Sequence, residues 1–175
     1  APMTSSEYIS FKVSASSPSE AAPVTWEAVS DRIGVFVSEA GTGSALNDNA
    51  YYDAYTSTAS SRFFPLKDAD KLKWEDGKKY DVSLYYPFST KMRDAASIPV
   101  SVAEEQVVSI PLTTTQLKRS QIFVSSVKSV ERPDNGILEM SLAPVVAFVK
   151  VNVSSNLPVA CNSVRHSGEE GTAIA

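Results

Sequence analysis

The sequence predicts an all-β domain with little helix, and three observations support this prediction. Apolar and polar residues alternate with a period of two in most segments, which is typical of half-buried strands. Turn-forming residues separate these segments about every 8–12 residues, as in all-β domains. No window has the period of about 3.6 residues that marks a long amphipathic helix. The pattern therefore indicates a β-sandwich or a β-barrel.

The composition is that of one folded domain. The chain has 175 residues, of which 43% are hydrophobic, so it can bury a core of its own. We expect a single domain over residues 1–160 and, over residues 161–175, a tail or the start of a linker to a second domain. The net charge is −4, and basic residues are interspersed with acidic ones. The chain therefore lacks the basic patch of a nucleic-acid-binding protein.

No residue pattern points to catalysis. Cys161 and His166 are the only residues of their types, so neither an internal disulfide nor a cysteine-based metal site can form. The motifs of serine hydrolases, zinc proteases, phosphate-binding loops and EF-hands are missing. Residues 47–49 and Asp53 offer oxygen ligands for a calcium ion, but turn formation is the favoured interpretation. We predict no enzyme activity, no cofactor and no metal site.

The first half of the chain alternates clearly from its beginning. Ile9, Phe11 and Val13 alternate with polar residues, and a loop without periodicity follows over residues 14–23. Asp76 and Gly77 are expected to form a hairpin turn. The predicted strands are residues 9–13, 33–37, 51–55, 62–66, 71–74 and 79–86.

The second half continues this pattern up to residue 153. Its strongest alternation is in residues 145–153, and a Pro-Asp-Asn-Gly turn is expected at 133–136. The predicted strands are residues 98–102, 106–112, 121–131, 138–142 and 145–153. Single helical turns are expected only at 101–105 and 113–118. The longest apolar stretch, 143–149, is far shorter than the roughly 20 residues of a membrane-spanning helix, so we expect membrane contact only through a lipid anchor outside this chain.

The aromatic residues allow two interpretations. Tyr51, Tyr55 and Tyr85 are candidates for a platform that stacks on sugars or on a partner protein. Aromatic side chains also fill the cores of all-β domains, and this second interpretation is the favoured one. Trp26 and Trp74 are likewise expected to be core residues or loop anchors.

One ordered set of motifs goes beyond generic β structure. Residues 26–36 (W-E-A-V-S-D-R-I-G-V-F) resemble the W…GD-x-IGVF motif of the fimbrillin-like (Mfa-like) proteins that build type V pili. Asn49 and Tyr51 resemble the N-x-Y element that follows it, and residues 85–88 (Y-Y-P-F) resemble a Y-Y-P-Y segment. Leu142, Ala147 and the alternating valines up to residue 153 are similar to the family's late strand.

This resemblance implies a fold, a location and a mode of assembly. Family members are exported lipoproteins of the outer membrane and cell surface. Their N-terminal domain is a transthyretin-like antiparallel β-sandwich with Greek-key connections. Shaft subunits lose an N-terminal strand to proteolysis and accept a strand from a neighbour. The implied partners are therefore other pilus subunits, and host proteins or glycans where the pilus supports adhesion.

Two functional hypotheses follow. In the first, the chain is a pilus subunit, and Ile9, Phe11 and Val13 form the exchangeable strand. Residues 14–23 contain no Arg or Lys for a trypsin-like protease, which favours an anchor, tip or otherwise unprocessed subunit. In the second, the chain is a surface module that binds a carbohydrate or a host protein through the tyrosine platform. An apolar groove in the sheet would favour the first hypothesis, and an exposed aromatic cluster would favour the second.

Overall fold

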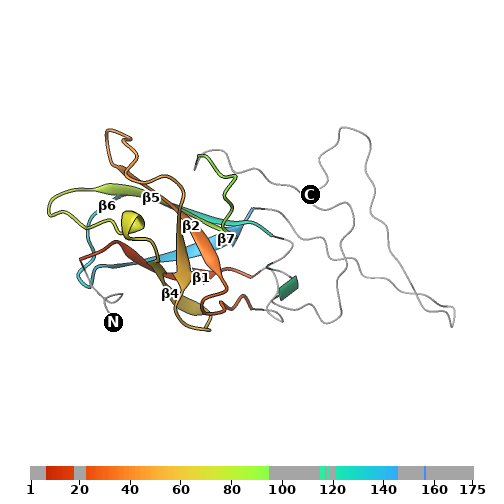
Figure 1. Cartoon of the computed structure of the whole chain (residues 1–175). Helices are drawn as coiled ribbons and strands as arrows, with labels where there is room; N and C mark the ends of the chain where they lie inside the picture. Colours follow the sequence, from red (N-terminus) through yellow and green to blue (C-terminus); the bar gives the residue numbers. More distant parts are fainter. Residues whose placement is uncertain are drawn as a thin grey trace, which may run out of the picture. The chain divides into compact units, whose positions relative to one another are not determined.

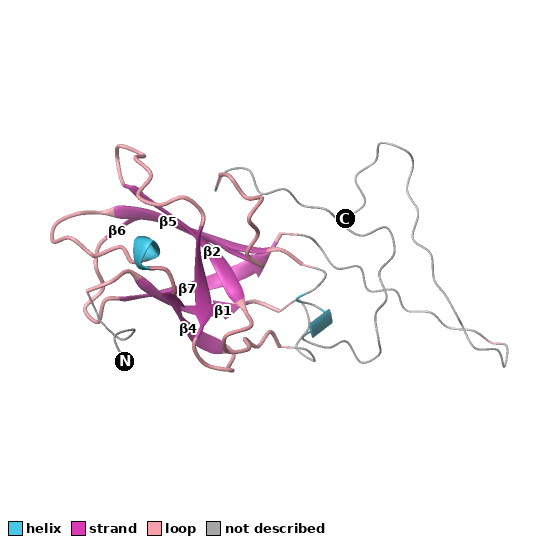
Figure 2. Ribbon diagram, viewed as in Figure 1, coloured by secondary structure: helices cyan, strands magenta, loops and turns pink. Residues whose placement is uncertain are grey.

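Seven strands and almost no helix make up the described part of the chain (Figures 1 and 2). The computed structural model describes residues 7–17, 23–94, 115, 116, 118, 121–145 and 156. The strands are β1 (Ser10–Ala15), β2 (Arg32–Glu39), β3 (Ala50–Ala54), β4 (Ser60–Pro65), β5 (Tyr80–Tyr86), β6 (Phe123–Val130) and β7 (Ile137–Pro144). A single 3-10 turn, η2 (Asp68–Asp70), lies between β4 and β5. All these elements belong to one compact unit, Ala1–Val145.

The seven strands form one closed sheet in the order β1-β4-β3-β2-β5-β6-β7. The barrel closes because β1 pairs with β4 on one side and with β7 on the other. All neighbouring strands are antiparallel except β1 and β7, which are parallel. The all-β prediction is confirmed, and the described strands form a closed barrel. The transthyretin-like topology implied by the resemblance stays a prediction, and the expected all-antiparallel pairing is corrected at β1–β7.

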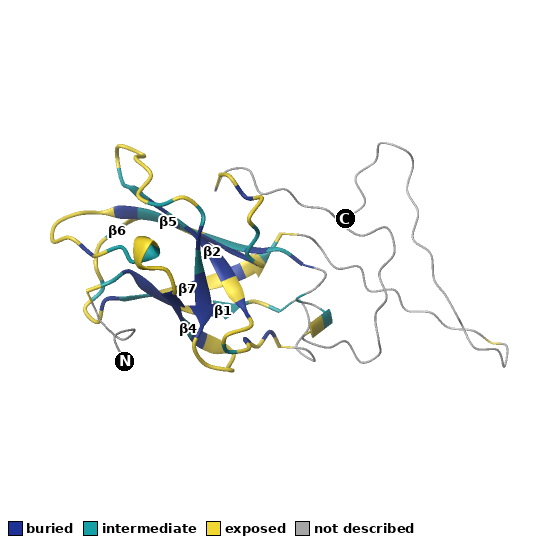
Figure 3. Cartoon of the chain, viewed as in Figure 1, coloured by how far each residue is buried: buried dark blue, intermediate teal, exposed yellow. Residues whose placement is uncertain are grey.

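The barrel interior is the hydrophobic core, and the strands that surround it carry most of the buried residues (Figure 3). In β5, for example, Tyr80, Val82 and Leu84 are buried, whereas Asp81 and Ser83 are half-buried. The largest fully buried side chains are Trp26, Tyr52, Tyr85, Phe11, Phe63, Phe123, Ile9, Ile33, Leu84, Leu142 and Val13. Trp26 and Trp74 are both buried, which confirms the interpretation of the two tryptophans as core residues.

Most predicted strands of the described part are confirmed, with boundary differences of one or two residues. The exception is the hairpin expected between residues 71–74 and 79–86. Lys73 instead forms a bridge with Tyr8, and Trp74 N–H donates to Glu7 O at 2.9 Å. The segment 72–74 therefore extends the contacts of β1, while β5 pairs with β2 and β6.

Several predicted elements lie outside the described residues. They are the strands at 98–102 and 106–112, the helical turn at 101–105, and the strand at 145–153 apart from Val145. Of the helical turn expected at 113–118, the described residues 115, 116 and 118 are helical. None of the helices in the described residues is long and apolar enough to cross a membrane.

Candidate functional site

The strand β1 is bonded along both sides. Its backbone pairs with β4 and with β7, and further hydrogen bonds continue beyond its ends. Ile9 N–H donates to Leu72 O at 2.7 Å, and Ser16 N–H donates to Leu142 O at 2.8 Å. β1 is therefore not an edge strand in this chain. Without β1, both β4 and β7 would be edge strands of the sheet.

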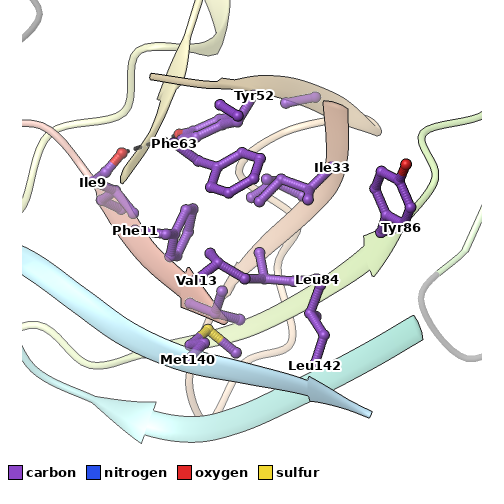
Figure 4. Packing of buried hydrophobic residues seen from close by; sticks show 14 of the residues in the cluster. Ile9, Phe11, Val13, Ile33, Tyr52, Phe63, Leu84, Tyr86, Met140 and Leu142 are labelled. Atoms are coloured by element: carbon purple, nitrogen blue, oxygen red, sulfur yellow. Dashed lines mark hydrogen bonds between the residues drawn. The ribbon is translucent and has the colours of Figure 1, made fainter. Parts of the chain in front are cut away.

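The three residues predicted for exchange all point into the barrel. Ile9, which directly precedes β1, and Phe11 and Val13 of β1 are each 0% exposed, and their side chains extend into the core in Figure 4. The Phe11 ring lies beside the Tyr52 ring of β3, with centroids 5.3 Å apart. Met140 and Leu142 of β7 lie on the other side of this row of side chains in Figure 4. The three residues thus fill consecutive inward positions of the hydrophobic core.

Two buried side chains donate hydrogen bonds to the backbone of β1. Tyr52 OH donates to Ile9 O at 3.1 Å, and Trp26 Nε1–H donates to Val13 O at 2.8 Å. Burial, and secondarily the negative charge of Asp70, raises the pKa of Tyr52, so its hydroxyl remains a proton donor. These two donors were not predicted, because a sequence pattern shows that an aromatic residue is buried but not what its polar atom contacts.

The segment before β2 is tied to the end of β5 through Asp31. The Trp26 ring packs edge-on against Tyr86 at 5.1 Å, and Tyr86 OH donates to Asp31 Oδ1 at 2.8 Å. The other carboxylate oxygen accepts a hydrogen bond from Glu27 N–H at 2.6 Å and forms an ion pair with Lys118. Burial raises the pKa of Tyr86, and the hydrogen bond to Asp31 adds to the shift. Trp26 and Asp31 of the segment 26–36 therefore contact Tyr86 of the Y-Y-P-F segment.

A second connection forms on the outside of the barrel. Gly34 of β2 lies in register between Tyr51 of β3 and Tyr85 of β5. Tyr85 OH donates to Asn49 Oδ1 at 2.5 Å, and Asn49 Nδ2 donates to Ser89 O at 2.8 Å. Burial raises the pKa of Tyr85. Gly34, Asn49 and Tyr85, one from each of the three motifs, thus connect β2, β3 and β5 on the outside of the barrel.

The predicted platform residues differ in their exposure. Tyr85 is 1% exposed, whereas Tyr55 is 62% exposed and packs edge-on against Phe64. Tyr51 is half-buried between Phe88, at 5.3 Å, and the guanidinium of Arg32, at 4.6 Å from the ring centre. Of the three, Tyr55 is the one that presents most of its surface to solvent. The platform itself stays a prediction.

Two of the polar residues considered for calcium, Asn47 and Asp53, contact protein atoms. Asn47 Oδ1 accepts a hydrogen bond from Val37 N–H at 2.8 Å, and Asp53 Oδ1 lies 2.8 Å from Arg32 Nε. Among the described residues, no group of three or more His, Cys, Asp or Glu side chains could hold a metal ion. A shallow pocket of about 320 Å³ is lined by Glu27, Asp31, Tyr86, Pro87, Thr115 and Lys118, and it contains none of the platform tyrosines.

The comparison with protein families agrees with the motifs. The fimbrillin-like family matches residues 19–164, which is most of the chain. No curated protein matches the sequence. Membership of this family indicates a pilus subunit that interacts with other pilus subunits at the cell surface. The contacts among the motif residues agree with the family match, and the match shows that the chain belongs to the fimbrillin-like family.

Proposed function

We propose that this chain is a structural subunit of a bacterial surface pilus that assembles by β-strand exchange, with β1 as the replaceable strand. The observation that carries the proposal is the position of β1. It is a single strand that pairs with both β4 and β7, and its inward residues Phe11 and Val13 are fully buried together with the preceding Ile9. The family match begins at residue 19, so it contains β2 to β7 but not β1.

Removal of β1 would convert the barrel into an open sheet with a groove. β4 and β7 would each expose a row of unpaired backbone groups, which readily bind another strand. Tyr52, Phe63, Met140 and Leu142 would line the groove floor, because they surround the β1 side chains in Figure 4. A strand from a neighbouring subunit would regain the backbone hydrogen bonds and fill the same pockets with alternate side chains.

The intact chain holds β1 firmly. Burying each of Ile9, Phe11 and Val13 stabilises the fold by roughly 1.5–3 kcal/mol, before any backbone hydrogen bond is counted. Exchange therefore requires a cut between β1 and β2 that makes the strand dissociable. Since residues 14–23 contain no Arg or Lys, a trypsin-like protease cannot make this cut. This favours an anchor or tip position, and a shaft position would need a protease of different specificity.

Strand exchange explains growth of a filament. Each subunit would offer its groove to one neighbour and a donated strand to the next, so the contacts would run head to tail and would not close. Adhesion, a lipid anchor and attachment at the outer membrane are further parts of this proposal. They rest on the family and not on a feature of the described residues.

A second candidate function rests on two exposed side chains. Tyr55 is 62% exposed and Val29 is 75% exposed. Their loops are adjacent, because Val29 N–H donates to Ala54 O at 2.9 Å. An exposed tyrosine beside an apolar residue suits a carbohydrate or a host protein. In a glycan array, loss of binding in Tyr55→Ala but not in Tyr51→Ala would favour this function.

Deletion of residues 1–23 tests the proposed assembly. We expect the shortened chain to form oligomers, or to bind a synthetic peptide of residues 7–17, whereas the full chain does neither. A stable monomer without affinity for the peptide would count against the proposal. If the shortened chain does not fold, a full chain with a specific protease site at residues 18–22 is folded first and then cut, and the same two readouts apply.

A further inference from the structure

Trp26 and Tyr52 contact the β1 segment through side-chain hydrogen bonds that are separate from the backbone pairing of the strands. Their donors reach the carbonyl oxygens of Val13 and Ile9, which lie four positions apart on the strand. Both bonds are buried, so they are not weakened by competition with water. One donor thus acts near each end of the row formed by Ile9, Phe11 and Val13.

These bonds contact the backbone and not a side chain. A carbonyl oxygen is present in every residue of any strand, so the two donors cannot distinguish one sequence from another. Sequence selection is left to the pockets, of which the middle one holds the Phe11 ring against Tyr52. Tyr52 therefore takes part in both tasks, since its ring contacts Phe11 and its hydroxyl bonds Ile9 O.

The two donors are themselves fixed in place. The Trp26 ring packs edge-on against Phe63 at 5.2 Å and against Tyr86 at 5.1 Å. The Tyr52 hydroxyl also lies 3.4 Å from Asp70 O, which anchors it beside η2. Because neither residue belongs to β1, both would remain on the groove after β1 has left.

We infer that Tyr52 and Trp26 are positioning residues that bind the backbone of whichever strand occupies the groove. We call this pair of backbone hydrogen bonds the grip. This inference rests on the proposed strand exchange. It specifies the donor as an extended segment of at least five residues, whose first and fifth carbonyl oxygens face Tyr52 and Trp26. The first, third and fifth side chains are apolar, and the third has aromatic size. Strands of different sequence are thereby held with the same two bonds.

A double-mutant cycle between the protein and the strand backbone tests the grip without any exchange. Full-length chains are assembled from a synthetic segment of residues 1–17 with the ligation seam at residues 18–22. An alkene replaces the peptide bond between Ile9 and Ser10, which removes Ile9 O. In the control, the alkene lies between Phe11 and Lys12. Each is combined with Tyr52 or with Tyr52→Phe, which keeps the ring, and the unfolding equilibrium is measured in urea.

The grip predicts coupling at one position only. Tyr52→Phe shifts the unfolding equilibrium about fivefold in the normal chain and in the control, and has almost no effect when Ile9 O is absent. Equal effects in all three chains would overturn the inference. An alkene between Val13 and Ser14 combined with Trp26→Phe gives the second cycle. Because Trp26→Phe also removes buried ring volume in every chain, the expected result there is a coupling of about fivefold between Trp26 and Val13 O on top of a general loss of stability.

Exchange is then measured separately in chains cut at an engineered protease site in residues 18–22. We expect Tyr52→Phe to shorten the residence time of a tagged 7–17 peptide about fivefold, for the natural peptide and for one with Val13→Ile alike. Exchange that is unaffected by Tyr52→Phe overturns the grip alone. Coupling without any exchange in the cut wild-type chain contradicts the proposed function, and with it the role of the two residues toward a donor strand.

Discussion

The ring of Tyr85 occupies the space that a side chain at position 34 would need. A Cβ atom added to Gly34 would lie 1.8 Å from Cε1 of Tyr85. Tyr85 can therefore lie flat across β2 and reach Asn49 with its hydroxyl. Phe36 and Phe88 stack on the same ring, at 6.0 and 6.5 Å between centroids. Two motif residues that are far apart in sequence thus depend on each other sterically.

We predict that Gly34→Ala destabilises the fold by about 3 kcal/mol, because the ring must leave its position and overpacking is costly. Chemical denaturation measures the effect. In a Tyr85→Ala background the same substitution should cost less than about 1 kcal/mol, since the space is then free. Additive effects of the two substitutions would show that Gly34 is required for another reason.

Val29 is a β-branched residue with a φ of 68°, and it is 75% exposed. This left-handed conformation costs roughly 1–2 kcal/mol for a residue with a Cβ atom, and glycine adopts it freely. We expect Val29→Gly to raise the free energy of unfolding by about 0.5–1 kcal/mol. Val145→Gly, at an exposed valine without a positive φ, is the control and should give no gain. An unchanged or lower melting temperature for Val29→Gly would contradict the strain argument.

Phe11→Ala should destabilise the chain by about 3–5 kcal/mol, because it empties a fully buried aromatic position in the middle of β1. Lys12→Ala, at the neighbouring outward position, should change stability by less than about 0.5 kcal/mol. Urea unfolding of both variants measures this difference. Similar values for the two would mean that β1 does not contribute to the core as described.

High pH should destabilise the fold through its buried tyrosines. Burial raises the pKa of Tyr52, Tyr85 and Tyr86 above the value of about 10 that tyrosine has in an unfolded chain. Above this pH the unfolded chain loses protons that the folded chain retains. The contribution of the three tyrosines to the free energy of unfolding is therefore complete below about pH 10. It decreases as the pH rises, by up to about 1.4 kcal/mol per pH unit for each tyrosine. Tyr52→Phe should reduce this slope between pH 10 and 11, and an unchanged slope would exclude Tyr52 as a source.

Local patterns predicted the strands well because alternation is a local property. The row Ile9, Phe11 and Val13 is one example, and the row Leu138, Met140 and Leu142 of β7 is another. Pairing is not local, so the parallel contact between β1 and β7 could not be deduced. The hairpin expected at Asp76 and Gly77 shows the same limit. The turn residues are where they were predicted, but residues 72–74 contact the start of β1 and not β5.

The candidate site was predicted only in part for a similar reason. Alternation placed Phe11 on one face of its strand, but it could not show that both sides of the strand are paired. Tyr85 belongs to an outward position of β5, which suggests exposure, and the space above Gly34 nevertheless buries it. Hydrogen bonds from Trp26 and Tyr52 to β1 depend on tertiary packing, so no sequence spacing indicates them.

Native mass spectrometry of the cut chain tests the central claim most directly. The full chain is folded with a specific protease site at residues 18–22, cut, and incubated with an isotope-labelled peptide of residues 7–17. We predict that the labelled peptide replaces β1 one for one, and that a peptide with Phe11→Asp does not. A cut chain that retains its own β1 indefinitely, or that takes up both peptides equally, would contradict strand exchange at this groove.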